Sequence, residues 1–218
     1  MKTIFSTGFI LILLIACMPV MYLSYVYPSL PATVPLHFNI YGEADRFGDK
    51  NDIWFPVLLL SVVSVFVYVL VHNLPKIDPK KTAGRPADLY HKIAFIIALF
   101  MAAINLIIVY SAKTGSFRFS KLLLPLMGLF FAVLGNYMHS IKPNYFVGFR
   151  TPWTLENEDN WRKTHQLVGK LWVPGGLLLT IASLVLPDKA GVIVFFVVLT
   201  ALVLVPAVYS YLYYKKNK

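Results

Sequence analysis

The sequence is poor in charged residues and in cysteine, and each shortage excludes a class of protein. Only 14% of the 218 residues are charged and 58% are hydrophobic, whereas soluble domains average about 25% charged. The single cysteine, Cys17, excludes an intramolecular disulfide and a cysteine-based metal site. The net charge of +10 comes from basic residues scattered over short loops, so we expect no direct binding of nucleic acid.

Recognisable catalytic motifs are missing as well. The chain has no His-Glu-x-x-His, no Gly-x-Ser-x-Gly, no phosphate loop and no dinucleotide fingerprint. Its five histidines show no metal-ligand spacing. No Asp, Glu, Lys or Arg lies near the middle of a predicted membrane span, which argues against a proton-coupled transporter. We therefore expect a protein that is not an enzyme and that has no metal or cofactor.

Long apolar runs are what the sequence does contain, and the mean hydropathy is +0.67. Each run approaches the roughly 20 residues that a helix needs to cross the hydrocarbon core of a bilayer. In lipid the backbone must satisfy its own hydrogen bonds, so these runs are expected to be helices. The pattern predicts an all-α integral membrane protein with six transmembrane helices, at about Ile4–Val26, Ile53–Asn73, His91–Ala112, Leu122–Ser140, Leu171–Leu186 and Val192–Tyr213.

The distribution of Lys and Arg predicts how the chain is oriented. The N-terminus, the tail and the loops after the second and fourth runs hold 14 of these residues, and the other three loops hold 6. Positive residues favour the cytoplasmic side. We expect a multi-pass membrane protein with both termini in the cytoplasm, in contact with the lipid bilayer.

The first run also allows a different interpretation. Leu14-Ile15-Ala16-Cys17 resembles a bacterial lipoprotein cleavage box, after which Cys17 would carry lipid. The residues that follow, from Met18 to Tyr27, remain apolar, whereas mature sequence after a cleavage site is normally polar. The uncleaved helix is the favoured interpretation.

The loop between the first two runs, residues 28–52, is predicted to be folded. Pro31 and Pro35 keep the backbone around them extended. Val34–Ile40 alternates well enough for a short strand, and Gly42 and Gly48 permit turns with positive φ.

Four carboxylates in this loop do not match the spacing of the twelve-residue calcium loop: Glu43, Asp45, Asp49 and Asp52. We expect them to be surface groups that pair with Arg46 and Lys50. His37 has no second matching histidine, so it is expected to be a hydrogen-bonded structural residue.

The loop between the fourth and fifth runs is unusually rich in aromatic residues, proline and glycine. Pro143–Leu155 is predicted to be irregular, and Pro152 keeps Thr151 out of a helix. Asn157 is a candidate cap for a helix that follows. This helix is expected to be short, amphipathic and interfacial, leading into the fifth span with a kink or break at Pro174.

Two interpretations of this loop remain open. It is either a docking surface or ligand clamp built on Arg150, Trp153 and Trp161, or an interfacial anchor with its aromatics at headgroup level. Within the spans, Asn105, Asn136 and His139 are expected to make interhelical hydrogen bonds.

The organisation that follows has three parts. Residues 1–73 are predicted to be a two-helix unit with a folded outer loop (28–52). Residues 74–90 form a cytoplasmic linker with three prolines and a glycine. Residues 91–218 form a four-helix unit that contains a signature loop (141–166).

Two segments resemble a known family. Pro143-Asn144, the run Val147-Gly148-Phe149-Arg150-Thr151-Pro152-Trp153-Thr154-Leu155, Asn157 and Trp161 resemble the signature of SdpI-type bacterial membrane proteins. The first-loop run, from Leu30-Pro31 through Leu36-His37-Phe38-Asn39 to Lys50, resembles a short domain of uncharacterised function that commonly precedes it.

The resemblance implies an immunity protein and receptor of the bacterial plasma membrane. It would protect the cell against a secreted toxic peptide on the outer side and hold a cytosolic transcriptional repressor at the membrane. The outer site would be shaped by His37, Asn39, Gly42, Asp45 and Lys50. The inner site would be shaped by Asn144, Gly148, Arg150, Thr151, Pro152, Trp153 and Trp161.

Two alternatives to this function remain. A small permease or lipid-interacting transporter would have a water-accessible cavity lined by Asn105, Asn136 and His139. An intramembrane enzyme would need a catalytic constellation, which the sequence does not display.

Overall fold

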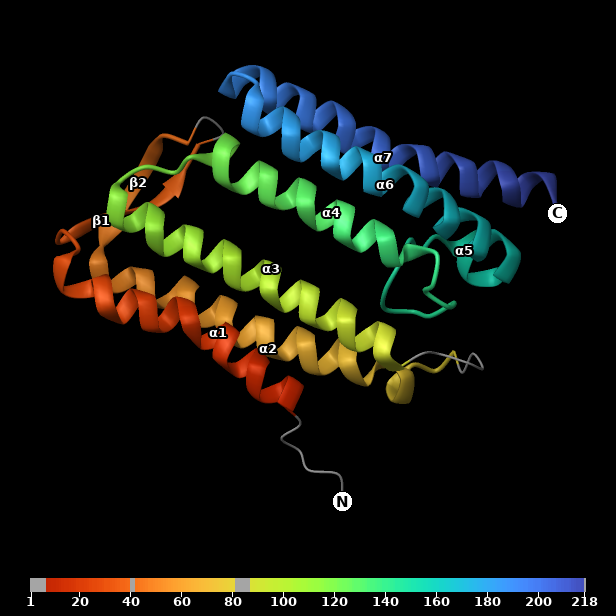
Figure 1. Ribbon diagram of the computed structural model, residues 1–218, viewed down its shortest axis with the longest axis horizontal. Helices are drawn as coiled ribbons and strands as arrows, with labels where there is room; N and C mark the ends of the chain where they lie inside the picture. The colour runs from red at the N-terminus through yellow and green to blue at the C-terminus, as the bar shows by residue number, and fades with distance from the viewer. Residues whose placement is uncertain (1–6, 40–41, 81–86, 218) are drawn as a thin grey trace. The chain divides into compact units, whose positions relative to one another are not determined.

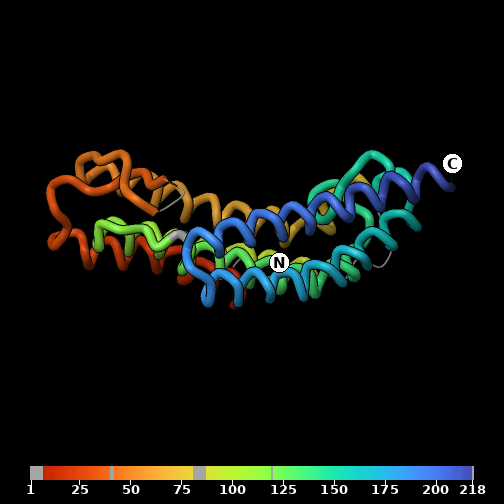
Figure 2. The backbone as a smooth tube through the Cα atoms, turned by 90° about the horizontal axis from the view of Figure 1, so that it is seen from above, coloured from red at the N-terminus to blue at the C-terminus, as the bar shows by residue number. Residues whose placement is uncertain are grey.

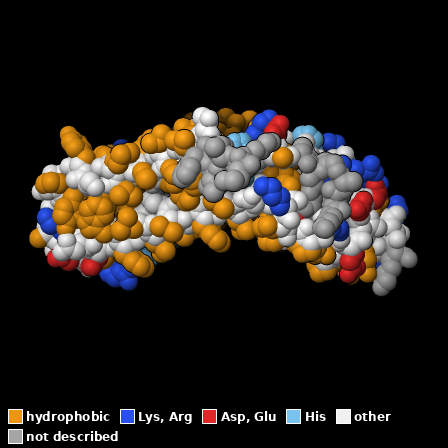
Figure 3. All heavy atoms as spheres, turned by 90° about the horizontal axis from the view of Figure 1, so that it is seen from below, with side chains coloured by type: hydrophobic (Ala, Val, Ile, Leu, Met, Phe, Trp, Pro, Cys, Tyr) orange, Lys and Arg blue, Asp and Glu red, His pale blue; other side chains and the backbone are white. Residues whose placement is uncertain are grey.

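The computed structural model describes residues 7–39, 42–80 and 87–217 and confirms an all-α membrane protein (Figure 1). Six of the described helices are long and apolar enough to cross a bilayer. Hydrophobic side chains dominate the face seen in Figure 3. The start of the first predicted span at Ile4, the strand end at Ile40, the linker residues 81–86 and Lys218 lie outside the described residues.

The six spans agree with the predicted runs in number and order. The short helix α5, at Pro152–Glu156, lies in the signature loop. The spans are α1 Thr7–Val26, α2 Trp54–Ile77, α3 Ala87–Thr114, α4 Leu124–Met138, α6 Glu158–Val185 and α7 Asp188–Lys216. A π-helical turn, Phe119–Leu123, leads into α4.

The described chain divides into two compact units, each built from two separate stretches of the sequence. One contains residues up to Leu70 together with Ala94–Leu123, and the other contains Val71–Ile93 together with Leu124 onward. The helices α2 and α3 therefore contribute to both. The boundaries predicted at residues 73 and 91 stay a prediction.

The first unit holds a β-hairpin against the ends of its helices. The strands β1, Thr33–Phe38, and β2, Ala44–Asp49, pair antiparallel. Their base is anchored in an apolar cluster that includes Leu23, Val34 and Val109. Burial of these side chains is what keeps the loop folded.

The two glycines of the hairpin have different roles. Gly42 adopts a φ of 79° at the turn, as predicted. Gly48 does not form a turn with positive φ, because it lies within β2. A Cβ there would lie 2.3 Å from Leu36 Cδ1, so the Leu36 side chain packs over the glycine across the hairpin and would have to shift to admit a larger residue.

The second unit is built on α6, which packs against α4 on one side and α7 on another (Figures 1 and 2). Small residues permit close approach of the α4 and α6 backbones. A Cβ at Gly176 would lie 2.4 Å from the backbone nitrogen of Ala132, and one at Gly128 would lie 2.8 Å from the Gly176 carbonyl oxygen. Such small-residue contacts are how helices associate in lipid, where the hydrophobic effect does not drive them together.

The region before the fifth span agrees with the prediction in part. The expected helix leads into the fifth span as the beginning of α6, and helical structure continues through Pro174 without a break, while a kink there stays a prediction. The segment expected to be irregular contains α5, because Thr151 caps a helical turn there. A capped turn satisfies backbone N–H groups that an irregular chain would leave to water.

Candidate functional site

Asn144 organises the first turn of the signature loop. Its side chain is fully buried. Its Nδ2 donates to the carbonyl oxygens of Lys142 and Val147 at 2.9 and 2.8 Å. Its Oδ1 accepts from the backbone nitrogens of Phe146 and Val147 at 2.8 and 2.6 Å. Every hydrogen-bonding position of the amide is used within the loop, so Asn144 sets the loop's shape and presents nothing to a partner.

Asp78, beyond the end of α2, ties a distant segment to this loop. Its carboxylate is buried and accepts from the backbone nitrogens of Tyr145 at 3.1 Å and of Lys80 at 2.8 Å. The Lys80 ammonium in turn donates to the Leu155 carbonyl oxygen. The Arg150 guanidinium donates to the Tyr145 carbonyl oxygen from an exposed position. Backbone groups therefore hold both cations in place.

A glycine, a histidine and a tryptophan form the packed centre of the loop. Gly148 has a φ of 114°, and a Cβ there would lie 2.4 Å from His165 Nε2. His165 Nε2 accepts from the Phe149 backbone nitrogen at 2.9 Å, and Nδ1 lies 2.8 Å from the Trp161 carbonyl oxygen. The imidazole stacks on the Trp161 ring with centroids 4.1 Å apart. Nε2 must be an acceptor and Nδ1 a donor, which corresponds to one neutral tautomer.

Trp161 is the largest fully buried side chain of the described residues, and its indole nitrogen donates to the Ile141 carbonyl oxygen at 2.7 Å. This bond joins the start of the loop to α6. The predicted residues Gly148 and Trp161 are thus brought together at one packed centre, and Asn144 shapes the turn that precedes Gly148.

Thr151, Pro152 and Trp153 belong to α5. Thr151 is extended, with φ −120° and ψ 158°, and its hydroxyl and that of Thr154 cap each other's backbone N–H groups. Pro152 occupies the first helical turn, where its missing N–H costs nothing. This arrangement confirms the expectation that Pro152 keeps Thr151 out of the helix.

Trp153 attaches α5 to α7. Its indole nitrogen donates to Ser210 Oγ at 2.7 Å, and its ring packs edge-on against Tyr211. The buried Asn160 of α6 donates to the Ser210 carbonyl oxygen at 2.9 Å. Three helices therefore meet at Ser210, a residue that nothing in the local sequence distinguishes.

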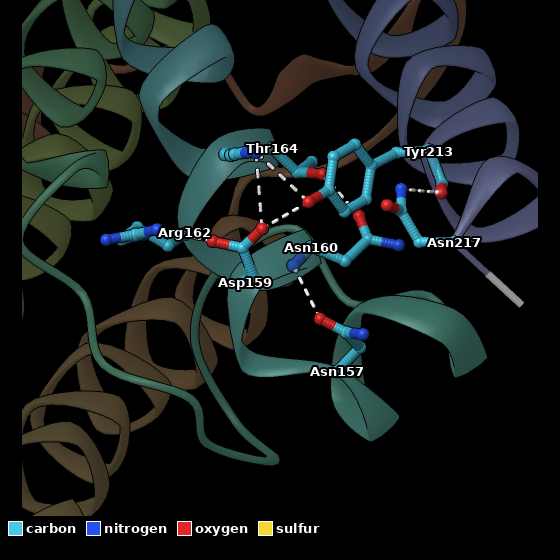
Figure 4. Close-up of polar contacts among 8 residues, drawn as sticks. Asn157, Asp159, Asn160, Arg162, Thr164, Tyr213 and Asn217 are labelled. Carbon is cyan, nitrogen blue, oxygen red and sulfur yellow. Dashed lines mark hydrogen bonds and ion pairs between the residues drawn. The ribbon is translucent and has the colours of Figure 1, made fainter.

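A second polar cluster joins α6 to α7 (Figure 4). Asp159 accepts from Arg162 and from the Tyr213 hydroxyl, and it lies 3.3 Å from the Lys163 ammonium. That ammonium also sits 4.7 Å from the centre of the Tyr213 ring. Asn157 caps α6, as predicted, by accepting from the Asn160 backbone nitrogen at 2.9 Å. These contacts fix the beginning of α6 against the end of α7.

The outer-loop residues are spread along the hairpin and do not converge on one point. His37 Nδ1 lies 2.5 Å from Asp45 Oδ1 across the strands, so His37 is hydrogen-bonded as expected. At the turn, the Asn39 side chain bonds both the side chain and the backbone nitrogen of Glu43, at 2.9 and 3.0 Å. At the base, the Lys50 ammonium lies 4.9 Å from the centre of the Tyr27 ring.

The polar residues predicted within the spans separate into two groups. Asn105 is buried and donates to the Val57 carbonyl oxygen and to Ser61 Oγ, both at 3.0 Å, which confirms the interhelical bond. Asn136 and His139 are exposed and line a surface hollow.

One close pair was not predicted from the sequence. His72 of α2 and His91 of α3 approach within 3.2 Å at their Nδ1 atoms. Among the described residues, no group of three or more His, Cys, Asp or Glu side chains gathers closely enough to hold a metal ion.

Comparison with known proteins places two regions of this chain in described groups. Residues 140–210 match the SdpI/YfhL protein family, and residues 14–61 match a domain of unknown function, DUF1648. The chain is 26% identical over 216 residues to the immunity protein SdpI of Bacillus subtilis (strain 168), covering 95% of this chain and 96% of that protein. No solved structure matches.

The family regions coincide with the two folded loops and the helices that carry them. The DUF1648 match includes the β-hairpin, and the SdpI/YfhL match includes Asn144, Gly148 and Trp161. The chain is therefore similar to SdpI-type membrane proteins over nearly its whole length, with the match to DUF1648 preceding the match to the SdpI/YfhL family.

Proposed function

We propose that this chain is a non-enzymatic immunity protein and receptor of the plasma membrane. It protects the cell against a secreted toxic peptide and holds a cytosolic transcriptional repressor at the membrane. The observation that carries the proposal is the near full-length similarity to an immunity protein, which extends over both folded loops. Similarity confined to the spans would support membrane location alone.

The hairpin supplies a rigid surface on the side to which we assign the toxic peptide. It is anchored by buried apolar residues and pinned at its turn by Asn39. Phe47 is 59% exposed on β2 and Phe55 is 72% exposed at the start of α2. Exposed aromatics on a rigid element are suited to anchoring a peptide ligand.

The signature loop supplies a second surface, which we assign to the repressor. Asn144, Thr154 and Trp161 are buried and maintain its shape. Tyr145, Phe146 and Arg150 are exposed beside them. Two aromatics next to an arginine have the composition of an interface anchor.

Growth of a sensitised strain tests the immunity part. The chain would be expressed in Bacillus subtilis lacking its own immunity protein SdpI and exposed to that strain's toxic peptide. We expect survival to return. Equal killing with and without the chain, at matched membrane levels, would contradict protection against that peptide.

Substitution of Arg150 tests the receptor part. Because Arg150 is exposed and donates to the Tyr145 backbone carbonyl oxygen, Arg150→Ala should leave insertion intact and reduce toxin-induced reporter transcription to the uninduced level. Lys216→Ala removes the same charge from the exposed end of α7 and serves as the matched control. Normal induction by Arg150→Ala would overturn this assignment. Arg150→Lys asks whether the planar guanidinium is required.

A further inference from the structure

Two surface hollows join beside the signature loop. The first, of about 620 Å³, is lined by residues of the loop and of α6, including Lys142, Pro143 and Arg162. The second, of about 530 Å³, continues between α4 and α6. His139 and Gln166 line both hollows, so together they form one groove. Each volume falls within the range of about 300–1,000 Å³ that is typical of ligand sites.

The charge of the groove is predominantly positive. Lys80, Lys142 and Arg162 line the first hollow with a single carboxylate, Glu158, and Lys170 lines the second. Lys80 is held by the Leu155 carbonyl oxygen. Arg162 retains other N–H groups besides the one directed at Asp159. Clustered cations of this kind favour a phosphate-bearing ligand.

The floor of the groove changes character along its length. The first hollow is lined by charged and apolar groups in similar measure, whereas the second is mostly apolar. Gly135 of α4 and Gly169 of α6 line the second hollow, and a Cβ at Gly169 would lie 3.0 Å from the Gly135 carbonyl oxygen, so the two backbones approach closely beside it. A ligand that fits both parts has an anionic head and an apolar tail.

We infer that this groove binds one anionic phospholipid. The phosphate and its substituent lie among the cations that line the joined hollows, Lys80, Lys142, Arg162 and Lys170, and an acyl chain lies along the apolar part of the second hollow. The second hollow lies between α4 and α6, two of the candidate membrane spans, so the proposal has the ligand enter from the bilayer. This inference does not depend on immunity or on the repressor.

Native mass spectrometry of the full-length protein in detergent tests the inference, with phosphatidylglycerol as the anionic probe and phosphatidylethanolamine as the zwitterionic one. We expect phosphatidylglycerol to bind the wild type more tightly. The double variant Lys142→Gln, Lys170→Gln should weaken that binding by about tenfold. Both side chains are exposed, so the fold should be retained.

The control variant Lys215→Gln, Lys216→Gln removes the same charge from the exposed end of α7, away from the groove. It should bind phosphatidylglycerol like the wild type. Equal weakening by both double variants would overturn the inference, because it would indicate general surface attraction. Full competition by inorganic phosphate or soluble glycerophosphate at the lipid's own concentration would also overturn it, because the tail would then contribute nothing.

Discussion

At the scale of single residues, the signature motif consists mainly of residues that maintain the fold of the loop. Asn144 satisfies four hydrogen-bonding positions inside the loop. Leaving such buried groups unpaired costs about 1–3 kcal/mol each. The motif therefore maintains the fold of the loop, and the recognition that we propose there depends on its exposed residues, Tyr145, Phe146 and Arg150.

Gly148 gives a sharp test of this interpretation. Gly148→Ala would add both strain at a φ of 114° and a contact of 2.4 Å with His165 Nε2. We expect a loss of about 2–5 kcal/mol in the free energy of unfolding, measured by thermal denaturation in detergent.

Gly115→Ala is the matched control. Gly115 has a φ of 72°, and a Cβ added there would have no neighbouring atom within 4 Å. Strain alone should cost about 1–2 kcal/mol. Equal losses at the two positions would show that the contact between Gly148 and His165 has no energetic importance.

At the scale of elements, α6 is the helix on which the second unit depends. It contacts α4, α5 and α7. Its first turns carry Trp161 and His165, which form the packed centre of the signature loop with Gly148. Its later turns carry Gly169 and Gly176, which contact the backbone of α4. Because one continuous helix supplies both, a shift of α6 against α4 would move the signature loop as well.

Gly176→Ala should separate α4 from α6. The new Cβ would meet backbone atoms of Ala132 and Gly128 at 2.4 and 2.5 Å, and backbone atoms cannot rotate away. We expect a loss of about 1–3 kcal/mol in stability, read from the unfolding temperature.

Gly191→Ala in α7 is the corresponding neutral change. Its Cβ would meet its nearest neighbour at 3.6 Å, an ordinary contact. Alanine is the better helix former by about 1 kcal/mol, so stability should stay equal or rise. A Gly176→Ala protein as stable as the Gly191→Ala protein would refute close backbone packing as the basis of the α4–α6 contact.

At the scale of the whole molecule, the orientation in the membrane decides which loop meets which partner. The distribution of Lys and Arg predicts the hairpin outside and the signature loop inside. Cys17 is exposed in α1 and is the single cysteine, so Cys17→Ser gives a background for site-directed labelling.

In that background, Phe47→Cys should react with a membrane-impermeant thiol reagent on intact cells. Glu156→Cys should react only after the cells are permeabilised. Both positions are exposed, so access to the side chain does not limit either reaction. The reverse labelling pattern would show that the chain is inserted in the opposite orientation. The proposed sides for the toxic peptide and the repressor would then be wrong.

Much of the fold follows from local sequence. The spans follow from the length of the apolar runs, and the cap of α6 follows from Asn157. The extended Thr151 follows from Pro152, and the turn at Gly42 follows from the freedom of glycine. Each of these features depends on residues a few positions apart, so sequence alone is sufficient.

The joining of distant segments required the tertiary structure. The local sequence does not indicate that Asp78 accepts a hydrogen bond from the Tyr145 backbone, 67 positions away. It also does not indicate that Ser210 accepts one from Trp153, 57 positions away. The same holds for the groove, whose cations come from three separate segments. The sequence by itself determined a six-span membrane protein with two distinctive loops, since hydropathy and backbone preference act locally. Only the tertiary structure decided which residues of those loops are buried and maintain the fold and which are exposed, because burial depends on packing between distant segments.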